Sequence, residues 1–286
     1  QVNDGVSVDY KIDTQSPLVN AQVMAYWDSI DIDETRVSDS RADSTEKETY
    51  GLNINNLSQF EKITLLYGVD GSHSTFSAKR GGPNRPIPPE ADIDMWGAFT
   101  QAIIPLSPSW SVELGARYDD FAVDAKNLDQ SRSDNALSPS AALIWKTTDN
   151  LELTLRHDSA FRAPTAEELY STGTHFCMGP GMCNTFIPNP DLEAEKAENT
   201  ELMARWQVTP AWSVKASVFE NRVDNFIEQT VSMSPFPGNT YWANVEDAKL
   251  HGFEISTQYQ QENLNLSLAY GQTRGKDQST GDPLNN

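Results

Sequence analysis

One segment of the chain gathers the side chains best suited to binding a metal ion. It runs from Phe161 to Asn199 and contains His175 together with Cys177 and Cys183, the only two cysteines in the sequence. A neutral imidazole nitrogen is a common metal ligand, and thiolates bind soft metals. A long connection of this kind in a compact protein is usually either functional or disordered. We therefore take this segment as the first candidate for a binding site.

The two cysteines can be used in two ways. The residues between Cys177 and Cys183 include two glycines and a proline, so the chain can fold back and close a disulfide in an oxidising compartment. So small a ring would add only about 2 kcal/mol of stability, and its use would be to hold His175 in place. Alternatively, the thiols, His175 and the nearby methionines could form a soft metal site. The turn-forming residues between the cysteines favour the disulfide.

The ends of the segment carry clear local signals. "FRAP" (Phe161–Pro164) predicts the end of a strand, because Pro164 cannot donate a backbone hydrogen bond to a neighbouring strand. "TAEELY" predicts a short helix capped by Thr165, with Glu168 three residues further on. "PNPDL" (Pro188–Leu192) is typical of a turn. We expect the stretch between them, "STGTHFCMGPGMCNTF", to be mobile.

The stretches around this segment alternate apolar and polar side chains, which is the period-2 pattern of a strand with two different faces. The predicted strands are on the order of 10 residues long, near the length that crosses a bilayer at a tilt. The clearest apolar sets are Trp110, Val112, Leu114, Ala116 and Tyr118; Leu151, Leu153 and Leu155; Leu202, Ala204, Trp206 and Val208; Leu264, Leu266, Leu268 and Tyr270; and Ile63, Leu65, Tyr67 and Val69.

The connections between these strands alternate in length. Short ones occupy 107–109, 147–150, 209–211 and 260–263, and long ones occupy about 71–92, 122–135, 161–199 and 225–250. Four tryptophans lie within a few residues of short turns, as in the interface girdle of a membrane barrel: Trp110, Trp145, Trp206 and Trp212. This layout predicts an all-β, antiparallel up-and-down transmembrane β-barrel, of which the chain supplies about 12 strands. A soluble β-sandwich with a binding or adhesion role is the alternative.

Composition limits the function classes. The formal net charge is -20 and the pI is about 4.4, so the chain lacks the basic character of a nucleic-acid-binding protein. A mean hydropathy of -0.54, with no apolar run of roughly 18 residues, excludes a helical membrane protein. The chain opens at Gln1 without a signal peptide and stops within turn-like residues. We expect residues 1–286 to be a fragment of a larger barrel domain whose terminal strands are missing.

The binding segment resembles a known family. "FRAP" at 161–164, His175 and "NPDL" at 189–192 resemble the FRAP and NPNL boxes that bracket a haem-ligating histidine in TonB-dependent outer-membrane receptors for haem and haemoproteins. "VDNFI" at 223–227, followed by "ANVEDAKLHGFEI" at 243–255, resembles the hairpin common to TonB-dependent receptors. Asp191 stands where the second box usually has Asn, and the two cysteines are not part of the family pattern.

The resemblance implies a receptor that takes up haem, free or from a haemoprotein, by TonB-dependent transport across the outer membrane of a Gram-negative bacterium. Its partners would be haem or a haemoprotein, the TonB complex and outer-membrane lipid, with no nucleic acid. Haem would be the transported ligand, and the protein would have no catalytic cofactor and no enzymatic activity. The plug domain of the family, through which TonB would act, is missing from residues 1–286.

The resemblance also implies roles for single residues. His175 would be the axial ligand of the haem iron. Phe176, Met178 and Met182, together with Phe186, would supply an apolar and polarizable surface for the flat macrocycle. Bidentate contacts of Arg162 would brace the base of the loop, and a contact with a haem propionate is the alternative role of this residue. The whole base consists of the two boxes, Phe161, Arg162, Ala163, Pro164, Asn189, Pro190, Asp191 and Leu192.

Two other functions compete with haem uptake. The first is a TonB-dependent receptor for a siderophore or another nutrient, in which His175 is incidental. The second is an outer-membrane hydrolase built on His157, Asp158 and Ser159. Because consecutive strand residues point to opposite faces, His157 and Asp158 cannot form a catalytic relay, which disfavours the hydrolase.

The other histidines are weaker candidates. We expect His73 to be a solvated residue of the first long loop and His251 to lie at the end of a strand. For His157, a satisfied ion-pair network with Arg156 and Asp158 in the barrel lumen is the simplest expectation.

Overall fold

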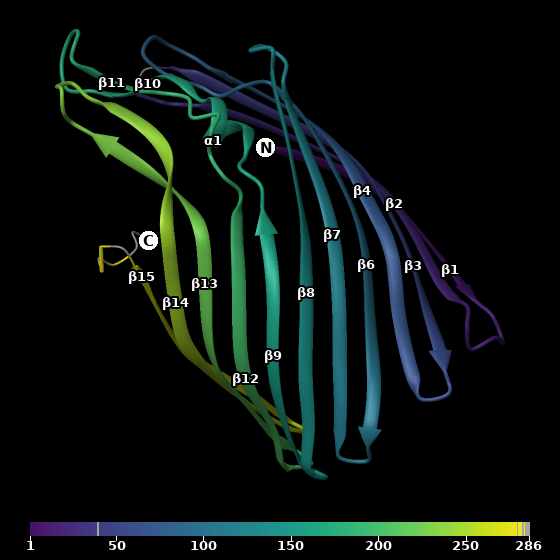
Figure 1. Ribbon diagram of the computed structural model, residues 1–286. Helices are drawn as coiled ribbons and strands as arrows, with labels where there is room; N and C mark the ends of the chain where they lie inside the picture. The colour runs from purple at the N-terminus through teal and green to yellow at the C-terminus, as the bar shows by residue number, and fades with distance from the viewer. Residues whose placement is uncertain (39, 279, 282, 284–286) are drawn as a thin grey trace.

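Most of the chain forms one strongly curved antiparallel sheet, shown for the computed structural model in Figure 1. The structure describes residues 1–38, 40–278, 280, 281 and 283. Within them, twelve long strands follow one another, each hydrogen-bonded to the next. They are β1 (Val2–Asp13), β2 (Asn20–Thr35), β3 (Ala42–Phe60), β4 (Ile63–Arg80), β6 (Ala91–Ser107), β7 (Trp110–Ala125), β8 (Gln130–Thr148), β9 (Leu151–Arg162), β12 (Glu195–Thr209), β13 (Trp212–Ser232), β14 (Asn239–Gln261) and β15 (Leu264–Asp277).

The remaining elements lie at the upper end of the sheet in Figure 1. They are β5 (Pro86–Ile87), α1 (Ala166–Tyr170), β10 (Thr172–Cys177) and β11 (Cys183–Phe186). No helix in the described part of the chain is long and apolar enough to cross a membrane. β1 and β15 are the outermost long strands, and no pairing between described residues joins them. The sheet is an open part of a barrel wall, which confirms the predicted fold and strand number.

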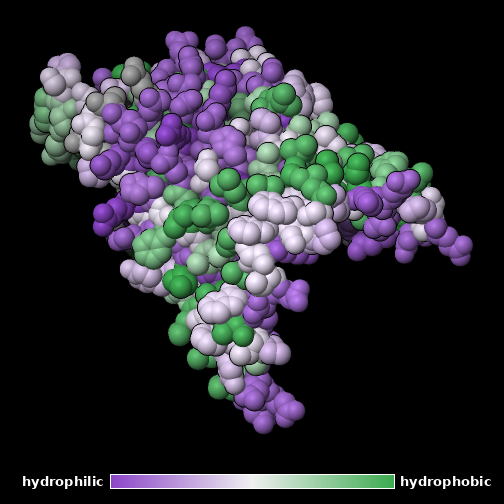
Figure 2. All heavy atoms as spheres, turned by 60° about the horizontal axis from the view of Figure 1, so that its bottom comes forward, coloured by the Kyte–Doolittle hydropathy of each residue, from purple (hydrophilic) through white to green (hydrophobic). Residues whose placement is uncertain are grey.

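Apolar side chains of neighbouring strands form continuous rows across this sheet. Leu143 of β8 pairs with Leu155 of β9, and Leu155 pairs with Leu202 of β12. The same row continues through Val218 of β13 to Phe253 of β14. All five side chains are exposed, between 38% and 54%. Figure 2 shows hydrophobic residues gathered between hydrophilic tips and a broad hydrophilic area. An uncovered apolar zone of this kind is suited to contact with hydrocarbon.

Tight turns lie at one end of the sheet, at the bottom of Figure 1. Beside them, the rings of Trp110 and Trp145 stack with centroids 5.1 Å apart. Trp206 and Trp212 flank the turn between β12 and β13, and Trp212 Nε1 donates a 2.7 Å hydrogen bond to Thr257 Oγ1. Amphipathic rings at this level are typical of a membrane interface. The predicted placement of the four tryptophans near short turns is confirmed.

Charged residues occupy the other side-chain parity. Arg117 of β7 donates hydrogen bonds of 2.7 and 2.8 Å to Asp70 of β4 and one of 2.7 Å to Asp119 of its own strand. On β9, Arg156 pairs with Asp158 at 2.8 Å. Paired ions on one parity and exposed apolar rows on the other are the pattern of a barrel wall between water and lipid.

Connections at the end opposite the tight turns are shorter than the sequence predicted. Of the expected loop at 71–92, the residues up to Arg80 belong to β4. The expected loop at 122–135 reduces to residues 126–129, and much of 225–250 belongs to β13 and β14. These predictions were wrong because they relied on the alternation of apolar and polar side chains to recognise a strand. Outside the hydrocarbon, both faces of a strand meet water. The period-2 hydropathy then disappears although the strands remain hydrogen-bonded.

We predict that residues 1–286, expressed alone, aggregate in buffer without detergent. The outer edges of β1 and β15 present unpaired backbone groups, and the apolar rows lack a covering layer. Analytical ultracentrifugation with and without detergent measures this. A monodisperse species in plain buffer would contradict the membrane-barrel interpretation.

Candidate haem-binding site

The connection between β9 and β12 starts and ends at one group of charged side chains. Arg162, the last residue of β9, donates hydrogen bonds of 2.7 and 2.6 Å to the carboxylate of Glu195, the first residue of β12. Arg162 Nη1 also lies 2.9 and 3.1 Å from the two carboxylate oxygens of Glu168 in α1. One guanidinium therefore holds together two strand ends and the helix.

Glu168 also caps the helix. Its backbone N–H donates a 3.2 Å hydrogen bond to Thr165 Oγ1, while its carboxylate accepts a 2.8 Å hydrogen bond from the backbone N–H of Thr165. This reciprocal pair confirms the capping box predicted from the sequence. Immediately before it, Ala163 and Pro164 are buried and Phe161 is half-buried. The first box is thus a packed strand-to-helix junction.

α1 and the end of the connection pack on the sheet through an apolar cluster. Leu169 and Leu192 are 0% exposed, whereas the neighbouring Asp191 is exposed. Burial raises the pKa of the Tyr170 phenol, because the phenolate would lose its contacts with water. The full cluster comprises Ala91, Val123, Ala125, Ala166, Leu169, Tyr170, Leu192 and Ile227.

The second box joins the helix to two strands. The backbone N–H of Asn189 donates a 2.9 Å hydrogen bond to the carbonyl of Leu169, and Asn189 Nδ2 donates one of 2.9 Å to the carbonyl of Trp242 in β14. Arg132 of β8 donates a 3.1 Å hydrogen bond to the carbonyl of Pro190. Both boxes therefore belong to one ordered base, on which the rest of the connection rests.

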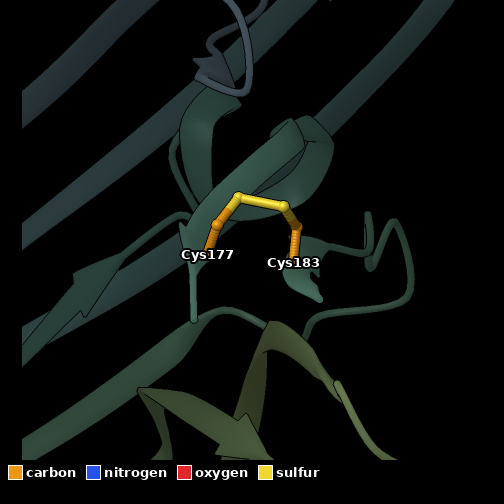
Figure 3. Close-up of a disulfide and its surroundings, with 2 residues drawn as sticks. All are labelled: Cys177 and Cys183. Atoms are coloured by element: carbon orange, nitrogen blue, oxygen red, sulfur yellow. A yellow bond between two sulfur atoms is a disulfide. The ribbon is translucent and has the colours of Figure 1, made fainter. Parts of the chain in front are cut away.

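The stretch expected to be mobile is instead an ordered hairpin. β10 and β11 pair in antiparallel fashion, and a disulfide joins Cys177 to Cys183 (Figure 3). β10 also pairs with β5, and β11 pairs in parallel with the start of β14. The predicted disulfide is confirmed, and the soft-metal alternative is wrong because neither sulfur is available as a thiolate. Backbone partners on both sides supply an order that the Gly- and Pro-containing sequence does not indicate.

His175 lies on β10 among aromatic rings. Its ring centroid is 4.9 Å from that of Phe186 and 5.1 Å from that of Phe176, which meets it edge-on. Phe186 in turn stacks on Trp242 of β14, with centroids 5.2 Å apart, and Trp242 packs against the apolar cluster of the base. The half-buried imidazole is thus connected to the packed base through a continuous series of ring contacts.

A pair of buried polar residues continues from the imidazole. His175 Nδ1 lies 2.8 Å from Thr240 Oγ1, and Thr240 Oγ1 donates a 2.6 Å hydrogen bond to Asn184 Oδ1. Thr240 and Asn184 are both 0% exposed. Neither residue could be found from the sequence, because they meet only through the parallel pairing of Phe186 with Thr240. A contact between two distant short stretches leaves no periodic pattern.

The two methionines lie at the tip of the hairpin, beyond the disulfide. The backbone N–H of Met178 donates a 2.9 Å hydrogen bond to the carbonyl of Met182, and their side chains are 47% and 39% exposed. In the turn between β13 and β14, Met233 and Phe236 are also exposed. These flexible apolar side chains could adapt to a flat hydrophobic ligand.

Two other histidines lie in strands. His73 is a residue of β4, where its Nδ1 is 2.8 Å from Asp94 Oδ1, and not of a loop. His251 lies within β14 opposite Glu220 and not at a strand end. The predicted loop position of His73 and the predicted strand-end position of His251 were wrong because the strands are longer than their alternating parts. The expectation that His73 is solvated is confirmed, since its side chain is 44% exposed.

His157 is not part of the ion pair between Arg156 and Asp158. It points to the opposite face of β9, where its Nδ1 is 2.9 Å from Thr200 Oγ1. The expected network of all three residues was therefore wrong, for the same reason of parity that disfavours a hydrolase.

The sequence of this chain is similar to those of known proteins. The family model described as "TonB dependent receptor-like, beta-barrel" matches residues 2–286. The heme/hemopexin utilization protein C of Haemophilus influenzae strain Rd is 30% identical over 318 residues, which cover 100% of this chain and 44% of that protein. The chain thus spans less than half the length of this relative.

Two solved structures share the fold. The Serratia marcescens hemophore receptor HasR, in a complex with its hemophore HasA and heme, superposes with a TM-score of 0.82 at 18% identity, over 96% of this chain and 48% of that one. The siderophore receptor PirA from Acinetobacter baumannii has a TM-score of 0.70 at 16% identity, over 99% of this chain and 46% of that one. Because both identities are low, these likenesses describe the fold alone.

We predict that Arg162→Ala loosens the base of the connection. The substitution leaves the carboxylates of Glu168 and Glu195, which are only 15% and 11% exposed, without their cation. Because the Arg162 side chain is itself 42% exposed, we expect the local opening free energy to fall by about 1–3 kcal/mol, less than for a fully buried pair. Hydrogen exchange of the amides at 165–192, in the full-length protein in detergent, measures this.

Arg156→Ala is the matched control. Arg156 lies on the same strand, with a side chain 46% exposed and one ion pair to Asp158. Its removal should change exchange at 165–192 by no more than the roughly 0–1 kcal/mol typical of surface pairs. Equal effects of the two substitutions would contradict the bracing role of Arg162.

Proposed function

This chain belongs to the β-barrel family of TonB-dependent receptors, and on that premise we propose that it is part of an outer-membrane receptor that takes up haem. The name of the relative from H. influenzae, which matches the whole chain, supports haem as the ligand. The apolar rows and the tryptophans near the tight turns support a position in the outer membrane of a Gram-negative bacterium. The family is one of receptors and not of enzymes.

One observation carries the assignment of the binding residue. His175 is a half-buried imidazole with Nδ1 engaged and aromatic rings on two sides, on a hairpin closed by a disulfide. Its Nε2 has no hydrogen-bond partner among the described residues. An imidazole fixed in this way can donate the Nε2 lone pair to haem iron with little ordering cost.

The proposed uptake involves ligand exchange and no covalent change in haem. Haem, free or carried by a haemoprotein, would reach the rim formed by β10, β11 and the turn between β13 and β14. His175 Nε2 would replace an axial ligand of the donor, while Phe176, Met178 and Met182 cover the apolar macrocycle. We assign the contact with the TonB complex, and the plug, to a part of the full-length protein outside this chain.

A receptor for a siderophore is the second candidate. The similarity of the fold to PirA supports it, because one barrel architecture serves different ligands. In that case the surroundings of His175 have only a structural purpose. The two candidate functions differ in the role of His175, since only a haem receptor would use its imidazole as a ligand of the iron.

We predict that His175→Ala removes axial ligation of haem. Hemin titrated into the full-length protein in detergent should give a shifted Soret band in the wild type. The variant should lose this shift and bind hemin at least about tenfold more weakly, because a ligand to the iron is gone. An unchanged spectrum and affinity would contradict the assignment of His175, and the absence of a hemin-dependent band from both proteins would favour the siderophore receptor.

His73→Ala is the matched control for this titration. His73 is also partly exposed and also has Nδ1 hydrogen-bonded, to Asp94, but it lies on β4. Its removal should leave the Soret band and the hemin affinity at wild-type values.

A further inference from the structure

We infer that Thr240 and Asn184 are positioning residues that hold His175 in the tautomer protonated on Nδ1, so that Nε2 presents a free lone pair. The inference concerns hydrogen bonds within the unliganded protein, and its consequence for haem rests on the proposed function. It follows from the number of protons that each of the three side chains can donate.

Two backbone carbonyls fix the orientation of the Asn184 amide. One end of this buried side chain lies 3.3 Å from the carbonyl oxygen of Ser232 and 3.4 Å from that of Pro237. Carbonyl oxygens only accept hydrogen bonds, so that end must be the NH₂ group, which donates to both. The other end, Oδ1, therefore faces Thr240 and can only accept.

The Thr240 hydroxyl has one proton to donate. It goes to Asn184 Oδ1, 2.6 Å away, because an oxygen without a proton needs a donor. Thr240 Oγ1 can then only accept from His175 Nδ1, which lies 2.8 Å away. Because Thr240 and Asn184 are both 0% exposed, water cannot easily reach them and take the place of either hydrogen-bond donor or acceptor.

The proton on Nδ1 settles the state of the imidazole. A neutral imidazole carries one proton, so when Nδ1 donates, Nε2 holds a lone pair. In the opposite tautomer, the lone pairs of Nδ1 and Thr240 Oγ1 would face each other. The Thr240 hydroxyl could avoid this only by turning its proton toward Nδ1, which would leave the buried Asn184 Oδ1 without a hydrogen-bond donor. Hydrogen bonding to the second nitrogen is the usual way in which proteins orient a histidine that binds a metal.

The parallel pairing of β11 with β14 makes this arrangement possible. It sets Thr185 opposite Asn239 and Phe186 opposite Thr240, which brings Asn184 beside the start of β14. The two carbonyls that fix Asn184 belong to the end of β13 and to the turn that follows it. The tautomer of a residue on β10 is therefore determined by the conformation of the neighbouring hairpin.

The test measures the tautomer directly in the unliganded full-length protein. The protein is labelled with ¹⁵N-histidine, placed in lipid nanodiscs and kept at pH 8, and its imidazole ¹⁵N shifts are recorded by NMR. The His175 signals are those missing from His175→Ala. We expect protonated Nδ1 and unprotonated Nε2 in the wild type. A wild-type protein with its proton on Nε2 would overturn the inference, whether or not the variants of Thr240 and Asn184 fold.

Three substitutions test the two positioning residues. Thr240→Ser keeps the hydroxyl and should keep the Nδ1-protonated state. Thr240→Val removes the acceptor, and Asn184→Ala frees the Thr240 proton to donate to Nδ1, so both should give a substantial population protonated on Nε2. Wild-type shifts in both Thr240→Val and Asn184→Ala would overturn the inference.

Hemin titration of the same proteins measures the consequence. Thr240→Ser should bind hemin as the wild type does, whereas Thr240→Val and Asn184→Ala should bind about 10- to 100-fold more weakly, the usual effect of removing an outer partner of a metal ligand. Wild-type hemin affinity in both variants, with His175→Ala impaired, would overturn the positioning role and leave the proposed function intact. If His175→Ala binds hemin normally, the proposed ligand fails, and the NMR result alone decides the inference.

Discussion

A strand that crosses hydrocarbon must pair its backbone N–H and C=O groups with neighbouring strands, because no water is present to satisfy them. This constraint accounts for the long antiparallel ladder from β1 to β15 and for the tight turns at one end. It also restricts where binding residues can be placed. Irregular backbone and short strands are possible only at the rim, and the only helix of the described residues and the β10–β11 hairpin both lie there.

At that rim the connection between β9 and β12 behaves as a small folded unit. Arg162 joins the two strand ends to α1, and an apolar cluster around Leu169 and Leu192 fixes the helix on the sheet. From this base, Trp242 and Phe186 extend the packing to His175. A binding residue on a packed and disulfide-closed hairpin is better preorganised than one on a mobile loop, so less of the binding free energy is lost in ordering it.

The sequence alone indicated much of the architecture. Two confirmed predictions depend on the solvent on each side of the barrel wall. They are the alternation of apolar and polar side chains, as at Leu151, Leu153 and Leu155, and the placement of tryptophans beside short turns. The capping box of Thr165 and Glu168 is a local signal, and it too was confirmed. Local signals of this kind are readable because they depend on residues close together in the chain.

The features that the sequence did not reveal depend on the surrounding solvent and on contacts between residues distant in the chain. Beyond the membrane both faces of β4 meet water, so His73 was placed in a loop although the strand continues. The hairpin around His175 was expected to be mobile, and this prediction failed because its partners, β5 and the start of β14, are remote in sequence. The positioning pair of Thr240 and Asn184 could not be found either, since no spacing rule joins residues 56 positions apart.

The most direct test of the account is pulsed electron paramagnetic resonance of the hemin-loaded full-length protein labelled with ¹⁵N-histidine. If His175 is the axial ligand, the ferric haem shows a strong coupling to a histidine ¹⁵N nucleus, and this coupling is absent from His175→Ala. A haem without strong histidine coupling in the wild type, or with the same coupling in the variant, would contradict the central claim.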